Sequence, residues 1–229
     1  MSDMPPIEVP GFLERRPPVE LDAATRAAFD REFDEAVAAG RAIDVGRAAP
    51  VWQFLAYIVD TREVLVHGSS DPGIAEFEPR QPDDTTQFGN QLAVYAASDA
   101  LWAMYFAILD RGGHPMSLIN AAVRFEGPHG LGDPHYFFSI SSAAREADAF
   151  SPGTVYLVPR DGFVQEPARE FGGNVVRSEQ WASLTPARPL TRAAVAPTDF
   201  PLLDRIRGHD DETTFARAQV DPDGFPWLE

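Results

Sequence analysis

The spacing of apolar residues changes at residue 64, and this change constrains the fold more than any other feature. Before it, Phe29, Phe33 and Val37 lie at i, i+4 and i+8 between Asp22, which has N-cap chemistry, and Gly40, a stop signal. After it, the apolar runs are short, rich in β-branched and aromatic residues, and separated by Gly, Pro and Asp. Helices followed by many short strands predict an α+β fold.

The pattern predicts an extended, proline-rich arm over residues 1–20, then helices over 23–39 and 51–59. Strands are predicted over 64–67, 92–96, 121–125, 136–140, 153–158 and 190–195, with one further helix over 98–111 capped by Ser98. Residues 69–91 and 160–178 are predicted to be long loops. We therefore divide the chain into an arm with helices (1–60), a main domain (61–207) and an acidic tail (208–229).

Composition excludes several classes of protein. The net charge of -16 argues against a nucleic-acid backbone or an anionic membrane as the main partner. The absence of cysteine excludes disulfides, thiolate metal sites and cysteine nucleophiles. No apolar run is long enough to span a bilayer and the N-terminus lacks a signal-peptide pattern, so we expect a soluble cytoplasmic protein.

Two strand ends carry the residues best suited to a binding site. At the first, the strand 64–67 ends in His67, followed by Gly68 and Ser69. A glycine there lets a ligand approach the backbone, and the imidazole can donate and accept hydrogen bonds. At the second, Tyr95 ends a strand that leads into the helix over 98–111.

Together these two strand ends resemble the nucleotide site of the ADP-ribosyltransferase superfamily, in the branch shared by diphtheria-type toxins and poly(ADP-ribose) polymerases. The resemblance covers about residues 64–200. It implies an ADP-ribosyltransferase-like split β-sheet core, with two facing and mostly antiparallel sheets around an NAD cleft, and here with a helical N-terminal extension. NAD would be the co-substrate, and the acceptor of ADP-ribose (protein, nucleic acid or water) stays unidentified.

The resemblance also implies roles for individual residues. His67 and Ser69 would seat the dinucleotide, and the Gly68 backbone would bind the nicotinamide carboxamide. Tyr95, with either Tyr105 or Phe106 on the following helix, would enclose the nicotinamide ring. These two aromatic candidates stay open at this point.

The family's third motif is a glutamate at the start of a late strand, and Glu179 matches it. Its carboxylate would stabilise the oxocarbenium-like transition state of nicotinamide loss. Glu166 and Glu170 rank lower, because Pro167 stands where a strand would begin. Members that modify arginine carry Glu or Gln two residues earlier, where this chain has Arg177, so the resemblance does not extend to arginine specificity.

Other interpretations remain for the same residues. His67 could end a buried strand, Tyr95, Tyr105 and Phe106 could belong to the core, and Glu179 could be a solvated turn residue. The whole domain could be a non-catalytic binding module for a nucleotide or a protein. RNA 2'-phosphate transfer, which uses the same fold, needs basic groups that an acidic chain is poorly equipped to supply. The loop from His129 to His135 has no metal-site spacing.

Overall fold

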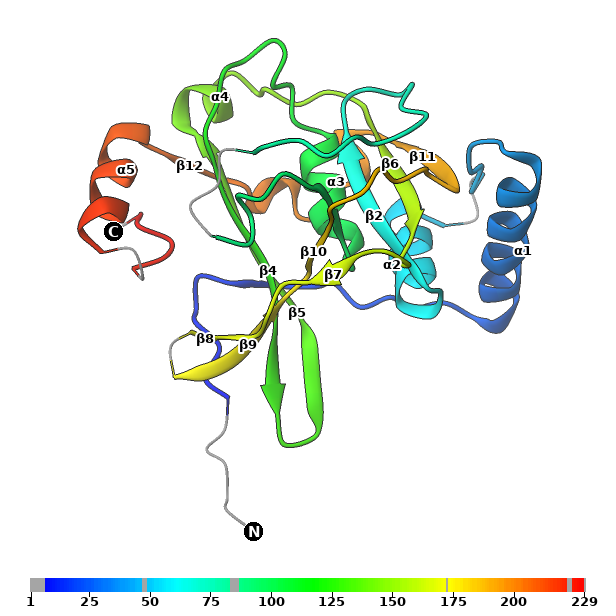
Figure 1. Ribbon diagram of the computed structural model, residues 1–229, viewed down its shortest axis with the longest axis horizontal. Helices are drawn as coiled ribbons and strands as arrows, with labels where there is room; N and C mark the ends of the chain where they lie inside the picture. The colour runs from blue at the N-terminus through cyan, green and yellow to red at the C-terminus, as the bar shows by residue number, and fades with distance from the viewer. Residues whose placement is uncertain (1–6, 47–48, 83–86, 172, 222–223, 229) are drawn as a thin grey trace.

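The chain folds into two antiparallel sheets with helices packed against them, which confirms the α+β class. The computed structural model describes residues 7–46, 49–82, 87–171, 173–221 and 224–228. Sheet A has the strand order β1-β5-β4-β9-β8, with β12 parallel to β5. Sheet B has the order β11-β6-β2-β3-β10-β7. In Figure 1 the β4–β5 hairpin runs through the middle of the molecule, with α1 and α2 to one side and α5 to the other.

The bounds of the elements are as follows. The helices are α1 (Ala23–Ala39), α2 (Val51–Thr61), α3 (Ala100–Ala107), α4 (Ser142–Glu146) and α5 (Asp211–Val220), with short 3-10 helices η1 (Pro197–Asp199) and η2 (Leu203–Arg205). The strands of sheet A are β1 (Glu14–Arg15), β4 (Leu118–Gly127), β5 (Gly130–Ser141), β8 (Arg169–Phe171), β9 (Asn174–Ser178) and β12 (Arg207–His209). The strands of sheet B are β2 (Val64–Ser69), β3 (Val94–Ala97), β6 (Gly153–Pro159), β7 (Val164–Gln165), β10 (Gln180–Ser183) and β11 (Thr191–Val195).

The first two helices form where their sequence signals lie. The Asp22 carboxylate accepts a hydrogen bond from the Thr25 amide at 2.7 Å, and Gly40 ends α1 at a φ of 61°. The buried side chains of α1 and α2, such as Phe29 and Trp52, share one apolar cluster with α3 and with the inner faces of both sheets. The N-terminal helices are therefore part of the main core.

Sheet B has an inner face, which packs on α3, and an outer face. Val66 and Ala97 belong to the inner cluster. Leu65 and Ala96, their neighbours in sequence, belong to a second cluster on the outer face. Because side chains alternate along a strand, this assigns every residue of β2 and β3 to one face or the other.

Several boundaries differ from the sequence-based prediction. The helix predicted over 98–111 is α3 alone, and its N-cap is Asp99, whose carboxylate accepts from the Trp102 amide at 2.9 Å. Ser98 is not the cap, because its hydroxyl is bound elsewhere. The predicted loop 160–178 contains β7, β8 and all of β9, and the acidic tail contains α5, which Asp210 caps. These are short or exposed elements with weak apolar patterns.

The predicted loop 69–91 is held down along part of its length. Ile74 and Phe77 pack into the outer cluster, and Phe77 pairs with Ala187 as an isolated bridge. The Ile74 amide also donates to the Tyr156 hydroxyl at 3.0 Å. Residues 83–86 of this segment lie outside the described residues.

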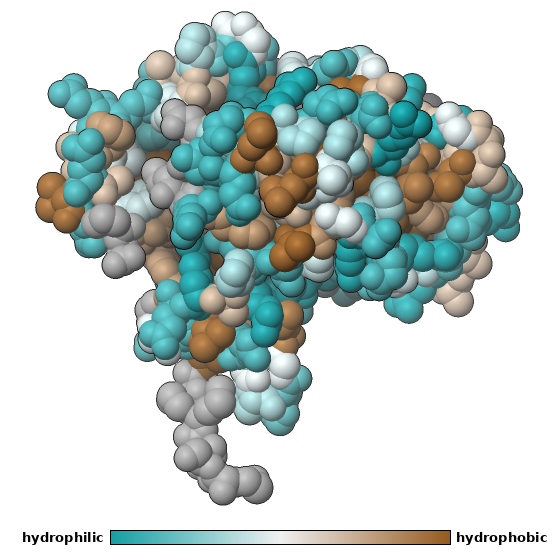
Figure 2. Space-filling view, viewed as in Figure 1, coloured by the Kyte–Doolittle hydropathy of each residue, from teal (hydrophilic) through white to brown (hydrophobic). Residues whose placement is uncertain are grey.

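The surface drawn in Figure 2 is largely hydrophilic, with small and separate hydrophobic patches. Scattered apolar residues of this kind are normal on a folded protein. No helix in the described part of the chain is both long and apolar enough to cross a membrane.

Candidate functional site

Three polar residues from separate segments lie on neighbouring strands of sheet B. His67 lies on β2, Ser98 directly follows β3, and Glu179 directly precedes β10, in the sheet order β2-β3-β10. Alternation along β2 and β3 places His67 and Ser98 on the outer face. Glu179 is bonded to Ser98, so the three motif segments share one face of the sheet.

His67 fills a gap between two strands that separate. Among the described residues, β2 and β3 have a single pair of opposed positions, Val66 and Ala97. Beyond that pair the His67 side chain crosses the gap, and its Nδ1 donates to the backbone oxygen of Tyr95 at 2.7 Å. This bond fixes the tautomer with the proton on Nδ1, because a carbonyl oxygen only accepts.

The surroundings of His67 keep the imidazole neutral. Burial lowers the pKa of His67, the Tyr95 carbonyl raises it, and the positive charges of Arg111 and Arg80 lower it further. The ring also packs on Phe77, with 4.4 Å between the ring centroids. A neutral imidazole within reach of the electrostatic influence of two arginines suits an anionic ligand, whose charge the arginines would balance.

Glu179 is the residue at which the chain passes from sheet A to sheet B. Its amide donates to the Ala122 oxygen of β4 at 3.0 Å, and its oxygen accepts from the Ser98 amide at 2.9 Å. The backbone of Glu179 is thus held by both sheets at once. Its side chain leaves a fixed point, as a catalytic or ligand-binding carboxylate requires.

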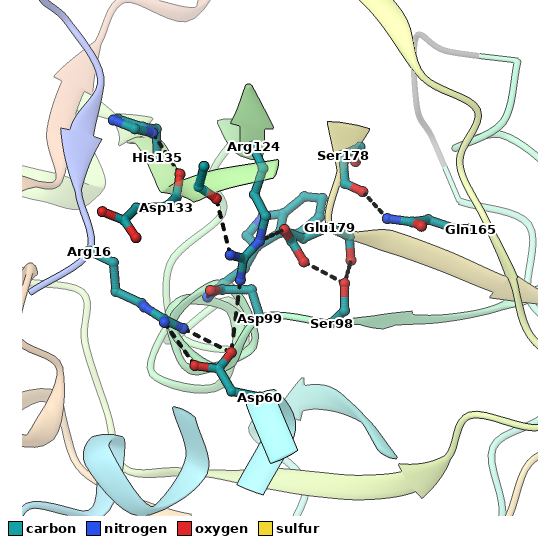
Figure 3. A network of polar contacts seen from close by, with 12 residues as sticks. Arg16, Asp60, Ser98, Asp99, Arg124, Asp133, His135, Gln165, Ser178 and Glu179 are labelled. Carbon is teal, nitrogen blue, oxygen red and sulfur yellow. Dashed lines mark hydrogen bonds and ion pairs between the residues drawn. The ribbon is translucent and has the colours of Figure 1, made fainter. Parts of the chain in front are cut away.

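The carboxylate of Glu179 is buried, and each of its oxygens accepts a hydrogen bond (Figure 3). The Ser98 hydroxyl donates to Oε2, and Arg124 Nε donates to Oε1 at 2.5 Å. Only 4% of the residue is exposed, which excludes the interpretation of Glu179 as a solvated turn residue. Burial raises the pKa of Glu179, and the Arg124 charge opposes that shift.

Arg124 joins Glu179 to the N-terminal region. A second nitrogen of Arg124 lies 3.8 Å from the Asp60 carboxylate at the end of α2. Asp60 in turn receives two bonds from Arg16, at 3.1 and 2.8 Å. Figure 3 shows this alternation of charges from the arm to Glu179. A buried carboxylate with a guanidinium partner stays ionised more readily than one without it.

Asp99 is a second buried carboxylate next to this network. It accepts from the Tyr136 hydroxyl at 2.6 Å as well as from the Trp102 amide. Burial raises the pKa of Asp99, and the same contact and burial raise the pKa of Tyr136. Asp99 is therefore tied to the helix start and to β5, as its N-cap position indicates.

The structure places Tyr105 in the core, which corrects its assignment as a wall of the nicotinamide slot. Its side chain is fully buried, its hydroxyl donates to the Ser139 oxygen at 2.9 Å, and its ring stacks on Phe138 with centroids 4.5 Å apart. Tyr105 lies on the side of the short, apolar helix α3 that packs on the side chains of β5. No surface of Tyr105 is left for a ligand.

Phe106 and Tyr95 are both less buried than Tyr105. Phe106 packs at the margin of the inner cluster. Tyr95 alternates with Ala96 and so faces the α3 side, where its hydroxyl donates to the Phe88 oxygen at 2.9 Å and accepts from the Gln91 amide at 2.8 Å. Of the two aromatic candidates on the helix, only Phe106 is not fully buried, and it lies with Tyr95 on the side of sheet B opposite to His67.

Gly68 and Ser69 each have a structural role. A Cβ on Gly68 would lie 1.8 Å from the Ala103 oxygen, so the glycine lets α3 pack directly on β2. The Ser69 hydroxyl accepts from the Asp71 amide at 3.1 Å and shapes the turn after the strand. The Gly68 side that faces α3 is closed, whereas its edge toward β3 lies along the strand gap.

Sequence reasoning missed two residues of the site. Arg124 was hidden inside a predicted strand, where a charge among buried residues is itself the signal that a partner exists. Trp181 donates from its indole nitrogen to the Ser98 hydroxyl at 2.9 Å, and Arg160 lies over its ring at 5.3 Å. A cavity of about 410 Å³ adjoins Trp181 and is lined by Arg160, Phe163 and neighbouring residues.

A metal centre finds no support in the described part of the chain, where no three His, Cys, Asp or Glu residues are grouped to hold an ion. In the loop considered for metal, His135 Nδ1 donates to the Asp133 oxygen at 2.9 Å. The chain matches no protein-family model, no curated protein and no solved structure. Its function is therefore argued from the geometry of these residues.

Proposed function

We propose that this protein binds NAD and transfers its ADP-ribose to an acceptor, or to water, on an ADP-ribosyltransferase-like fold. The observation that carries the proposal is the position of His67, Ser98 and Glu179 on one face of three neighbouring strands. Three segments far apart in the sequence supply an imidazole, a hydroxyl and a carboxylate to one face. Arg80 and Arg111, near His67, add positive charge where a diphosphate would lie.

The spacing of these groups suits a ligand that extends along the sheet. Glu179 stands opposite Ser98, which is level with Leu65 on β2, two residues before His67. Two strand spacings and two residues correspond to roughly 10 Å across and about 7 Å along the sheet, or about 12 Å between the Cα positions. A nucleoside between His67 and Glu179 would fill that distance.

In the proposed reaction, the bond between the nicotinamide nitrogen and the ribose C1' breaks and its electron pair leaves with nicotinamide. The ionised Glu179 stabilises the positive charge that develops on the ribose. The acceptor then bonds to C1' and releases its proton. His67 holds the ligand on the outer face of sheet B. Tyr95 and Phe106 lie on the opposite, α3 side of the sheet, so their rings take no part in this contact. Ser98 and Arg124 orient Glu179, and Arg124 keeps it ionised despite its burial.

The experiment is to mix the protein with NAD and measure both binding and free nicotinamide. Wild type should bind NAD and release nicotinamide, and Glu179→Gln should still bind NAD. Its rate should fall on the order of 10²–10³-fold, because the amide keeps the shape of the carboxylate and loses its charge. Glu170→Gln, a change of the same kind at an exposed position, is the matched control. An unchanged rate in Glu179→Gln would remove the catalytic role from Glu179.

A second function, a non-catalytic nucleotide-binding module, is favoured by one observation. The Arg124 charge already neutralises the Glu179 carboxylate, which leaves less charge to stabilise a cation. In that case NAD would still bind, and its affinity would depend on His67 as it does in the enzyme proposal. No nicotinamide would appear even at high protein concentration.

A further inference from the structure

A groove of about 530 Å³ lies between the N-terminal arm and the ends of three other elements. We call it the arm groove. Its wall on one side is the arm segment 15–21, and opposite stand Arg26 of α1, Tyr57 and Asp60 of α2, and Asp133 of the β4–β5 hairpin. β1 pairs with β5, and the Arg16 amide donates to the Pro134 oxygen at 3.2 Å, so the arm wall is fixed in place.

Three arginines and two carboxylates line the arm groove, so its lining carries a net positive charge on an acidic protein. Arg15, Arg16 and Arg26 line it, whereas the whole chain has 19 basic residues and a net charge of -16. Arg16 is committed to Asp60 by two hydrogen bonds. The other two guanidinium groups make fewer polar contacts. Arg15 lies 3.7 Å from Asp133 with both side chains mostly exposed, and no hydrogen bond or ion pair among the described residues involves the Arg26 side chain.

The remaining lining is apolar or aromatic. Pro17, Pro18, Val19 and Leu21 from the arm face the groove together with the Tyr57 ring. Guanidinium groups bind phosphate and carboxylate oxygens in pairs, and apolar walls favour a ligand with a hydrophobic body. A ligand that joins an anionic group to an apolar body would match both kinds of lining.

We propose that the arm groove binds an oxyanion, a phosphate or carboxylate group attached to an apolar or aromatic body, through Arg15 and Arg26. A phosphate and a carboxylate present the same paired oxygens to arginine. Of the two carboxylates in the lining, Asp60 is paired with Arg16 and Asp133 with Arg15. Salt screens the more distant acidic residues beyond about 8 Å at physiological ionic strength.

The groove is connected to Glu179 through Asp60, which belongs to its lining. Asp60 is shared between Arg16, on the groove side, and Arg124, which holds Glu179. An oxyanion held by Arg15 and Arg26 also attracts Arg16, which lines the same groove. As Arg16 turns toward the oxyanion, Asp60 keeps Arg124 as its remaining partner, and the bond from Arg124 to Glu179 weakens. This coupling rests on the proposed function, and it makes the bound oxyanion an inhibitor of nicotinamide release.

Calorimetric titration of the full chain with inorganic phosphate, phenyl phosphate and benzoate tests the site itself. We expect one site, with phenyl phosphate bound more tightly than inorganic phosphate because of its ring. The variant Arg15→Ala/Arg26→Ala should lose about tenfold or more in affinity, since each arginine supplies charge-assisted hydrogen bonds. Benzoate decides whether a carboxylate serves as well as a phosphate.

The matched control is Arg169→Ala/Arg192→Ala, which removes the same charge at exposed positions outside the groove. If phenyl phosphate does not bind, or if this control loses as much affinity as the groove variant, the arm groove is not the site. A loss on Arg80→Ala instead would place the bound phosphate beside His67.

The coupling is tested with nicotinamide release. Saturating phenyl phosphate should slow the release by wild type and leave the release by Arg15→Ala/Arg26→Ala unchanged. Equal slowing of both proteins would overturn the coupling and leave the binding result standing. If neither protein cleaves NAD, the proposed function fails, whereas calorimetry still decides the groove.

Discussion

At the scale of single residues, Gly68 shows how one absent atom controls the packing of a helix on a strand. The Ala103 oxygen stands where a Cβ would be, and the same holds for Gly153 on β6 against the Ala107 oxygen, at 1.9 Å. Backbone atoms of a helix cannot rotate away as a flexible side chain does. The glycine next to His67 therefore has a structural reason of its own.

We expect Gly68→Ala to destabilise the fold by about 3 kcal/mol or more, because the clash forces α3 off the sheet. Urea unfolding measures this free energy. Gly112→Ala is the control, since Gly112 is exposed and the nearest atom to its added Cβ lies 3.9 Å away. Equal unfolding midpoints for the two variants would show that α3 can shift at no cost.

Glu179 and Arg124 form an ion pair in which each charge offsets the cost of burying the other. We expect Arg124→Gln to cost about 3–5 kcal/mol at neutral pH, because it leaves a buried carboxylate without its cation. Adding Glu179→Gln to that variant should recover much of the loss, as a double-mutant cycle would measure. Additive losses would mean that the pair contributes no coupling energy.

At the scale of elements, the start of α3 depends on Asp99 and not on Ser98. Asp99→Ala should cost about 2–4 kcal/mol, since it removes the cap and leaves the buried Tyr136 hydroxyl without its acceptor. Asp99→Asn keeps a side-chain oxygen and should cost less. Thermal unfolding of both variants beside Asp210→Ala, at the exposed cap of α5, gives the comparison. A loss as small as that of Asp210→Ala would contradict the double role of Asp99.

Neighbouring elements explain why Ser98, the predicted cap, acts elsewhere. The strand β3 continues its alternation through Ser98, so the hydroxyl points to the outer face and meets Glu179 and Trp181. One residue later the chain turns into α3, and the Asp99 carboxylate faces the free amides. Both residues have cap chemistry, and only the direction of the strand distinguishes them.

At the scale of the whole molecule, buried histidines make stability depend on pH. Burial lowers the pKa of His67, His135 and His209 below the ordinary value of 6.5. Between the folded and the ordinary pKa, the unfolded chain binds protons that the folded protein does not. Stability from these groups is therefore present above about pH 6.5 and is lost as the pH falls below it.

We expect His67→Gln to flatten the pH dependence of the unfolding free energy below about pH 6.5, by at most about 1.4 kcal/mol per pH unit. The raised pKa values of Asp99 and Glu179 act in the opposite sense, but they are common to both proteins and cancel in the difference of slopes. His129→Gln, at an exposed position, serves as the control. Parallel slopes for wild type and His67→Gln would contradict a lowered pKa for His67.

The sequence by itself determined the local elements, because caps and apolar periodicity act over a few neighbouring residues. Asp22, Gly40 and the spacing of Phe29 predict α1, and the strand predicted over 64–67 forms as β2, which continues to Ser69. The short strands of residues 160–178 and α5 were missed, because such elements depend on pairing or caps and carry little apolar pattern.

Only the tertiary structure decided which residues meet. The contact of Glu179 with Arg124 requires the chain to cross from sheet A to sheet B at that residue, and the burial of Tyr105 requires β5 to lie beneath α3. Both follow from the pairing of strands that are distant in sequence, which no local pattern encodes. The candidate site could thus be predicted as residue types on or next to strands. Its charge balance, from Arg16 through Asp60 to Glu179, came from the packing of the two sheets and the arm.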